Sequence, residues 1–266
     1  MNDTTIAPGT IIREWRKKRR MSQLELALEA EISQRHLSFL ENGRSRPSRD
    51  MALAISERLD MPLRQRNRLL AAAGFVPSYS ERPLDSETLR PAIETVQAVL
   101  KAHEPNPAIA VDRHWNMVLG NSAVPIFLAA IQDKSLLEPP VNILRLSLHP
   151  GGLAPLVVNF DELRAHLLDH LSRLNDLYAD EELHALEEEL RGYPGGSGRH
   201  PAPKPDQIAI PLMLRVGGQT LSFLSTITVF GTPRDVTLSE LAIETFFPVD
   251  DVTRAFVTAA AKTATT

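Results

Sequence analysis

The chain has 266 residues, of which 43% are hydrophobic and 23% are charged, values typical of a globular protein long enough for two domains. The absence of cysteine excludes disulfides and thiolate chemistry. No apolar run approaches the roughly 20 residues of a membrane helix, and residues 1–10 lack a secretory pattern. We therefore expect a cytoplasmic protein. The net charge of −4 combines +5 over residues 1–80 with −9 over residues 81–266, which indicates a polyanionic partner for the basic part alone.

Two helices are predicted within residues 10–30. An amphipathic, strongly basic stretch favours a helix from about Thr10 to Arg20. Ser22 and Glu25, three positions apart, form the capping-box pattern that starts a second helix. We expect the apolar face of the second helix to consist of Leu24, Ala27 and Leu28.

Three more short helices are predicted up to residue 74. Ser33 caps the third, and Asn42-Gly43 ends it because both residues tolerate a left-handed backbone. Pro47-Ser48 opens the fourth helix, and Pro62 opens a fifth that ends near Gly74.

The pattern changes after residue 74. Residues 75–90 are predicted to be a linker, because their Pro and Ser residues break any period. A helix is expected over residues 91–103, followed by two strands within residues 108–120 that turn at Asp112-Arg113. The strands are indicated by the alternating residues Ile109, Val111, Trp115, Met117 and Leu119.

Residues 121–205 are predicted to be mainly helical. Asn121-Ser122 caps one helix, and residues 141–148 form a short apolar segment. A long helix pair covers residues 160–178 and 180–191, and its leucine stripe is expected to be core rather than a dimer seam. Residues 192–205 are rich in Gly and Pro and are predicted to be a loop.

Strands return near the end of the chain. Residues 207–216 and 220–230 are strong strand candidates, and Gly217-Gly218 between them is a hairpin signal. Residues 241–247 indicate a further strand, and residues 250–262 a closing helix.

The sequence from Ser22 to Gly43 contains the pattern that is most informative about function. Two helices joined by a tight turn present a short amphipathic second helix, and a helix fits the major groove of DNA. Gln and Arg side chains match the edges of adenine and guanine. The exposed side of that helix offers Ser33, Gln34, Arg35, His36, Ser38 and Phe39.

Residues on either side of this helix are expected to hold the DNA backbone. Gln23 lies at the start of the preceding helix, where backbone N–H groups favour phosphate. The alternative is a small helical interaction module with solvated charges, but the combination of motif and basic charge favours DNA. The predicted DNA-binding residues are Gln23, Ser33, Gln34, Arg35, His36, Ser38, Asn42, Arg44 and Arg46.

This region resembles the Cro/repressor-type, or XRE, family of helix-turn-helix proteins. The resemblance rests on the sequence from Met21 to Ala27, the sequence from Ile32 to Arg44, and Pro47-Ser48. It implies a domain of five helices in which the third reads the bases. Glu31 departs from the pattern, since many members carry Gly in the turn.

The rest of the chain, over residues 91–256, resembles the ligand-binding domain of MmyB-like transcription regulators. The segments that carry the resemblance are Pro107 to Asn116, Leu119 to Asn121, and Thr228 to Phe230 with Pro233. The resemblance implies a PAS-like fold. The Gly/Pro-rich loop before the last strands departs from the family pattern, so the identity of the ligand is not carried over.

One histidine pair has the spacing of a metal site. His166 and His170 lie four residues apart on a predicted helix, with Asp169 beside them. No Glu follows the first histidine and no third ligand is evident, so we expect solvated histidines and no metal or other cofactor. The segment 195–198 is not expected to bind phosphate, because no Lys-Ser/Thr pair follows it.

The expected fold is an all-α N-terminal helix-turn-helix domain plus an α+β PAS-like C-terminal domain with an antiparallel sheet. We expect the DNA-binding domain at residues 1–76, a linker at 77–90 and the ligand-binding or dimerisation domain at 91–266. Specificity for double-stranded DNA requires two recognition helices, so we expect a homodimer on an inverted-repeat operator.

The C-terminal domain is expected to sense an apolar small molecule such as a fatty acid. Alternation along the strands places Ser225 and Thr226 on opposite faces, so only one can point a hydroxyl at a ligand. The alternatives are a ligand-free dimerisation scaffold and an enzyme tethered to DNA, although no catalytic cluster is visible. The predicted ligand-binding residues are Trp115, Met117, Phe127, Leu128, Leu212, Leu214, Phe223, Ile227 and Phe246.

Overall fold

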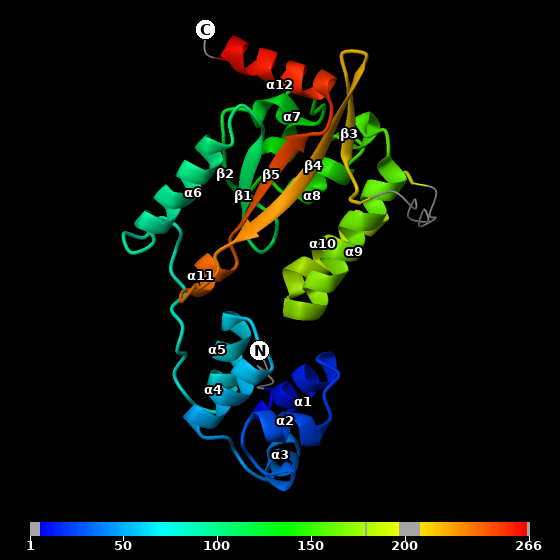
Figure 1. The fold of residues 1–266 in the computed structure, drawn as a ribbon. Coiled ribbons are helices and arrows are strands. Elements are labelled where there is room, and N and C mark those ends of the chain that lie inside the picture. Colours follow the sequence, from blue (N-terminus) through cyan, green and yellow to red (C-terminus); the bar gives the residue numbers. More distant parts are fainter. Residues whose placement is uncertain (1–5, 179, 197–207, 265–266) are drawn as a thin grey trace. The chain divides into compact units, whose positions relative to one another are not determined.

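The computed structural model describes residues 6–178, 180–196 and 208–264, and these form two compact units (Figure 1). The first unit runs to Pro83 and includes the distant segment Thr232–Ser239. The second unit comprises Leu84–Gly231 and Glu240–Thr266. Among the described residues, no helix is both long and apolar enough to cross a membrane.

Five short helices open the first unit, and local capping explains where they begin. The hydroxyl of Ser22 accepts from the backbone N–H of Glu25 at 3.2 Å, and the Glu25 carboxylate accepts from the N–H of Ser22 at 2.6 Å. The hydroxyls of Ser33 and Ser48 cap two further helices by accepting from the N–H groups of His36 and Met51, which confirms the predicted starts. The helices are α1 (Pro8–Lys18), α2 (Gln23–Glu29), α3 (Gln34–Glu41), α4 (Arg49–Arg58) and α5 (Leu63–Ala72).

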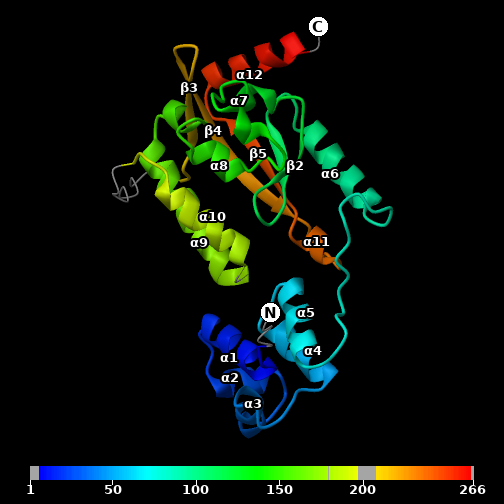
Figure 2. The same ribbon diagram turned by 180° about the vertical axis from the view of Figure 1, so that it is seen from behind.

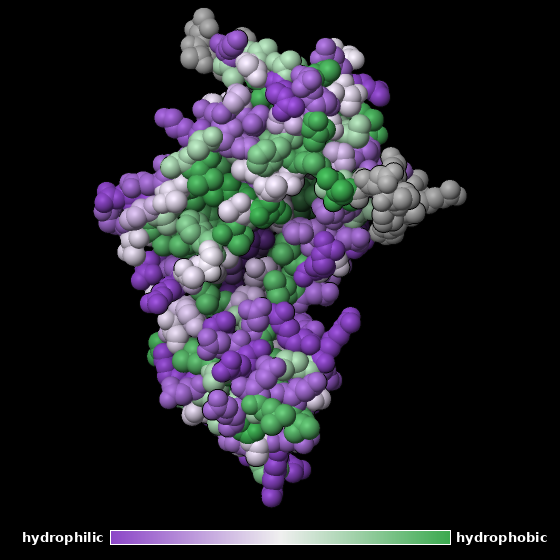
Figure 3. Space-filling view, viewed as in Figure 1, coloured by the Kyte–Doolittle hydropathy of each residue, from purple (hydrophilic) through white to green (hydrophobic). Residues whose placement is uncertain are grey.

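The prediction for the apolar face of α2 is correct for Ala27 and wrong for Leu24 and Leu28. Leu24 and Leu28 are 51% and 69% exposed, and hydrophobic surface is visible over α2 in Figure 3. Ala27 is buried together with Leu26, because α3 and α4 pack on that side of the helix. The buried residues of the surrounding core are Ile12, Trp15, Leu37, Leu40, Ile55, Leu59, Leu69 and Leu70.

The turn between α2 and α3 keeps a tight geometry without glycine. Glu31 has a φ of +55°, in the left-handed region. The N–H of Ile32 donates to the carbonyl of Ala27 at 2.9 Å and closes the end of α2. Since a side chain in this conformation costs about 1 kcal/mol, the turn tolerates Glu31 at a small loss of stability.

The segment predicted as a linker is bound to the first unit over its first part. The side-chain amide of Asn67 on α5 donates to the carbonyl of Tyr79 at 2.7 Å. Its oxygen accepts from the N–H groups of Ser78 and Tyr79 at 3.0 and 3.1 Å. Residues 78–79 are therefore held along α5 rather than extended between domains.

The same segment holds the distant residues 232–239. The N–H of Val236 donates to the carbonyl of Ser80 at 2.8 Å, and Arg82 pairs with the carboxylate of Asp235 at 2.9 Å. Asp235 also caps α11 (Val236–Ser239), which packs against α5. A piece of chain that lies between two strands of the second unit is thus part of the first.

The second unit is built on a five-stranded antiparallel sheet with the order β2-β1-β5-β4-β3. Its strands are β1 (Ala108–Val111), β2 (Met117–Gly120), β3 (Leu212–Val216), β4 (Gln219–Val229) and β5 (Ala242–Pro248). Its helices are α6 (Arg90–Ala102), α7 (Pro125–Leu128), α8 (Ile143–Leu148), α9 (Phe160–Tyr178), α10 (Glu181–Gly192) and α12 (Asp251–Ala264), with short 3-10 turns at Lys134–Leu137 and Ala154–Leu156.

Helices cover both faces of this sheet. Figures 1 and 2 show α6 and α12 on one face and α7, α8 and α9 on the other. Ile109, Glu244 and Ile227 are direct partners on three neighbouring strands, so they share the face toward α7, α8 and α9. Thr226 and Thr245 are partners on the opposite face and share a hydrogen bond of 2.7 Å. The expected α+β architecture with an antiparallel sheet is confirmed.

Two local predictions differ from the structure. Trp115, predicted in a strand, lies in the turn between β1 and β2 with a φ of +65°. The strand predicted from Gln207 begins at Leu212, and Gln207 lies outside the described residues. The hairpin prediction is confirmed, since Gly217 and Gly218 join β3 to β4 with positive φ values.

Candidate functional site

The polar side of α3 faces solvent. Ser33, Gln34 and Arg35, at its start, are exposed, and His36 and Ser38 are partly exposed. The opposite side is anchored by Leu37 and Leu40, which are fully buried. The start of α3 is therefore free to enter the major groove while its apolar side stays in the core.

Phe39 lies between two arginines on the α3 surface. The guanidinium carbon of Arg35 is 5.3 Å from the centre of the Phe39 ring, and that of Arg44 is 5.9 Å away. Both distances are within the range of a cation–π contact. The ring therefore restricts the conformational freedom of both arginine side chains.

A buried carboxylate ties α3 to α1 and α2. The Glu41 side chain has no exposed surface and accepts from Arg16 Nε at 2.6 Å and Arg16 Nη2 at 2.9 Å. It also accepts from Gln23 Nε2 at 2.8 Å, and Arg13 Nε lies 3.6 Å away. Burial raises the pKa of Glu41, but the hydrogen bonds from Arg16 and Gln23 outweigh this effect and hold the pKa below its ordinary value.

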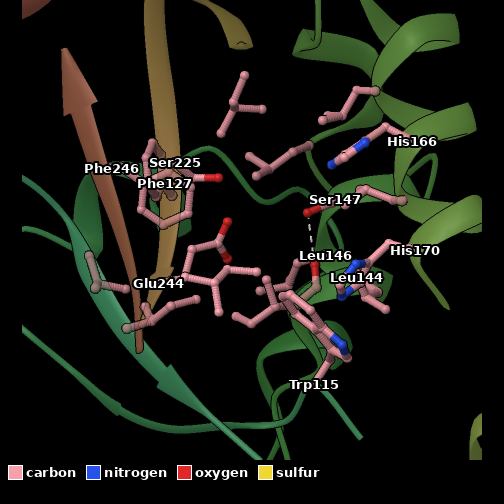
Figure 4. Close-up of a pocket in the computed structure, with 18 of the residues that line it drawn as sticks. Trp115, Phe127, Leu144, Leu146, Ser147, His166, His170, Ser225, Glu244 and Phe246 are labelled. Atoms are coloured by element: carbon pink, nitrogen blue, oxygen red, sulfur yellow. Dashed lines mark hydrogen bonds between the residues drawn. The ribbon is translucent and has the colours of Figure 1, made fainter. Parts of the chain in front are cut away.

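A second candidate site is a cavity of about 120 Å³ inside the second unit (Figure 4). Its sheet wall consists of Ile109, Leu212, Ser225, Ile227, Glu244 and Phe246. Its helix wall consists mainly of Phe127 and Leu128 from α7, Ile143, Leu144, Leu146 and Ser147 from α8, and Leu163, His166, Leu167 and His170 from α9. Phe127 packs edge-to-face against Phe223 and Phe246, which closes the site between α7 and the sheet.

Two groups of polar side chains face this cavity from opposite walls. Figure 4 shows Glu244 and Ser225 on the sheet wall, across from His166, His170 and Ser147 on the helix wall. Burial raises the pKa of Glu244 to about 7, although a hydrogen bond with Ser225 acts in the opposite direction. Burial also lowers the pKa of His170, with a smaller contribution from neighbouring positive charge. Burial therefore shifts both groups toward their neutral forms relative to the same groups in water.

A network of charges fixes the turn that carries Trp115. Arg113 lies 3.4 Å from the carboxylate of Asp180 and 3.7 Å from that of Glu240. His114 Nε2 is 3.1 Å from the same Asp180 carboxylate. Trp115 itself projects into the cavity and packs edge-to-face on the His170 ring at 5.3 Å. The polar contacts of Arg113 and His114 and the ring contact with His170 therefore fix the position of the Trp115 indole.

Both parts of the chain match models of known families. The model described as the MmyB-like transcription regulator ligand binding domain matches residues 92–260. The chain belongs to this family. The helix-turn-helix model matches residues 12–65, from α1 into α5. A comparison with curated proteins finds no match.

Both resemblances seen in the sequence are thereby confirmed. The MmyB-like regulator is a DNA-binding transcription regulator with an XRE-type helix-turn-helix and a ligand-binding domain.

The structure brings the predicted DNA-binding residues of this regulator to one region of the first unit. Eight of them belong to α3, its N-cap or the chain directly after α3. Gln23 is different, because its side chain is bound to Glu41 and lies partly buried. Asn42 accepts from Arg13 at 2.5 Å, which orients its amide. The direct contacts of all nine residues with DNA stay predictions.

The predicted ligand-binding residues divide into two groups. Six line the cavity, namely Trp115, Phe127, Leu128, Leu212, Ile227 and Phe246. Met117, Leu214 and Phe223 do not line it but belong to or pack against the surrounding core. Ser225, and not Thr226, is the hydroxyl of β4 that faces the cavity.

Sequence reasoning missed the polar residues of the cavity. His166 and His170 were expected to be solvated; His166 is exposed and His170 is partly buried, and both also line the cavity. Their spacing with Leu163 and Leu167 on one helix face would have placed them there. Glu244 alternates with Phe246 on the same strand face, a signal that predicts its position. Within the part of the chain that the structure describes, no group of three or more His, Asp or Glu could hold a metal ion.

Proposed function

We propose that this regulator reads operator DNA through α3 and that a small apolar molecule in the cavity changes its affinity for DNA. The observation that carries the proposal is the cavity of the ligand-binding domain. Five of its 21 lining residues are polar and the rest are apolar, which is how small-molecule sites are built. A ligand regulates only if it binds one DNA-binding arrangement better than another.

The size of the cavity restricts the ligand. Its volume of about 120 Å³ is close to that of an engineered cavity of roughly 150 Å³ that binds benzene. Pockets for drug-sized ligands measure about 300–1,000 Å³. A compact apolar molecule therefore fits the cavity as it stands, whereas a long fatty acid requires lining side chains to move.

On DNA, we expect Gln34 and Arg35 to meet base edges and the residues after α3 to hold phosphates. One α3 reads only a few base pairs, so the proposal includes a homodimer on an inverted repeat. It also includes the division into residues 1–76, 77–90 and 91–266, with the first unit holding residues 232–239 of the last domain.

Two strands that line the cavity are joined by a segment that belongs to the first unit. β4 and β5 both contribute to the sheet wall, through Ser225 and Ile227 and through Glu244 and Phe246. The connection between these strands contains the segment 232–239, which is held by the first unit. A ligand that shifts β4 or β5 therefore acts on a segment that is packed against α5.

The test starts with selection of an operator from random duplex DNA. A thermal-shift screen of fatty acids, amines and other apolar compounds follows, and operator affinity is then measured with each hit. A concentration-dependent rise in melting temperature together with changed operator affinity supports the proposal. Leu146→Phe, which fills the cavity, should remove the shift, whereas Val158→Phe, the matched enlargement at a 43% exposed site, should keep it.

A dimerisation scaffold is the second candidate function. The small cavity volume favours it, because a nearly filled core needs no ligand. If no compound raises the melting temperature while the protein still dimerises and binds its operator, the scaffold is the correct interpretation.

A further inference from the structure

Glu244 is a carboxyl group in an otherwise apolar part of the sheet wall. Its direct partners on the neighbouring strands are Ile109 and Ile227, which share its face. The Glu244 side chain is partly buried and lines the cavity (Figure 4). A carboxyl group at this position contributes nothing to apolar packing, which points to a role toward the occupant of the cavity.

The hydrogen-bonding capacity of Glu244 exceeds what the protein supplies. An ionised carboxylate offers about four acceptor positions. Ser225 is the side chain that lowers the pKa of Glu244 as a hydrogen-bonding group. Ser147, on the facing wall, donates its hydroxyl hydrogen to the carbonyl of Ile143 at 2.8 Å. The described lining residues therefore leave acceptor positions of Glu244 open toward the cavity.

The titratable groups that line the cavity lie on two opposite walls. Glu244 is the acidic group on the sheet wall, and His166 and His170 on α9 face it from the helix wall. A ligand carboxylate beside Glu244 would place two negative charges next to each other. A ligand ammonium group there would instead pair with the carboxylate and fill its open acceptor positions. The pKa of Glu244, about 7, means that ionising it costs little near neutral pH.

We propose that Glu244 binds the polar group of the ligand, and that the cavity takes compact apolar amines in preference to carboxylates of the same shape. This inference rests on the proposed function, since it concerns the occupant of the same cavity. Ser225 supports the carboxylate from the side, and the remaining walls hold the apolar body of the ligand.

The test compares three molecules of nearly equal size, benzylamine, benzyl alcohol and benzoic acid. Their dissociation constants are measured by calorimetry on the full chain at pH 7.5. We expect benzylamine to bind about tenfold more tightly than benzyl alcohol, and benzoate to bind more weakly than either. Glu244→Gln should weaken benzylamine about tenfold and change benzyl alcohol less than threefold. Glu94→Gln, the same change at an exposed residue of α6, should change neither.

A pH series on the wild-type chain provides a second measurement that needs no variant. Benzylamine requires the ionised form of Glu244, so its affinity should fall about tenfold for each pH unit below 6.5, whereas that of benzyl alcohol should not. His166 and His170 face Glu244 from α9. The pH dependence that remains in Glu244→Gln reports the contribution of groups other than Glu244.

The outcomes separate this inference from the function on which it rests. If benzyl alcohol or benzoate binds more tightly than benzylamine, or if Glu244→Gln leaves benzylamine binding unchanged, the amine assignment is wrong while the ligand-binding cavity stands. If none of the three compounds binds and the screen also finds nothing, both the assignment and the sensor function are wrong.

Discussion

Removing Arg16 should destabilise the first unit far more than an ordinary surface substitution. Arg16 makes two charge-assisted hydrogen bonds to Glu41, whose side chain is fully buried. Removing one partner of a buried ion pair costs about 3–5 kcal/mol. Gln23 and Arg13 remain near the carboxylate, so we expect the lower end, about 3 kcal/mol, for Arg16→Ala. For a unit of this size, that loss lowers the unfolding transition by about 12–24 °C.

The measurement is differential scanning calorimetry of the full chain, with the transition of the first unit followed separately. Lys17→Ala, at an exposed position of the same helix, is the control and should lie within about 0.5 kcal/mol of the wild type. The double variant Arg16→Met with Glu41→Leu should recover most of the loss, because it removes the unpaired charge as well. A transition lowered by less than about 3 °C in Arg16→Ala would refute the reasoning.

The same pair has a defined dependence on pH. The folded protein holds the pKa of Glu41 below its ordinary value, so the unfolded chain binds its proton first as the pH falls. The stability contributed by Glu41 is therefore fully present above its ordinary pKa and is lost as the pH falls through its folded pKa. Glu41→Gln should lose stability at pH 7 and show a weaker decline in acid than the wild type.

Three further predictions concern function. Arg35→Ala should lose about 1–3 kcal/mol of binding free energy on the selected operator and relax the sequence preference of the protein. Arg44→Ala should weaken binding evenly across sequences. Equal operator affinity of Arg35→Ala and wild type would contradict the assignment. Footprinting should show two inverted half-sites about one helical turn, or a multiple of it, apart, and protection of a single half-site by a monomer would exclude the homodimer. Asp235→Asn breaks the pair with Arg82, so the ligand should still raise the melting temperature but change operator affinity less than in the wild type; an unchanged effect would show that residues 232–239 are not the route.

Local chemistry explains the part of the fold that could be predicted from the sequence. Ser22, Ser33 and Ser48 cap the helices that follow them, and each cap involves a backbone group only three residues away. Gly217-Gly218 marks the β3–β4 hairpin for the same reason, since the turn conformation depends on the two residues themselves. The recognition helix α3 follows from such short-range signals, and the DNA-binding function was predictable with it.

The partners of each helix face and each strand were decided by the tertiary structure. Leu24 and Leu28 fit an inward face by spacing, but α3 and α4 pack on the side of Leu26 and leave both leucines exposed. Periodicity shows that a helix has an apolar face, whereas the position of its neighbours decides which of two adjacent stripes is covered. Glu41 is a similar case, because nothing in its own segment shows that Arg16, 25 residues away, neutralises it.

The cavity depends on contacts between residues that lie far apart in the chain. The sequence determined that β5 exists and that Glu244 and Phe246 share a face, because alternation is a local property. Only the strand order places β5 between β1 and β4, and only the packing of α9 brings His166 and His170 opposite Glu244. Strand pairing over more than a hundred residues is set by the total burial of the sheet and its helices, so no short segment records it.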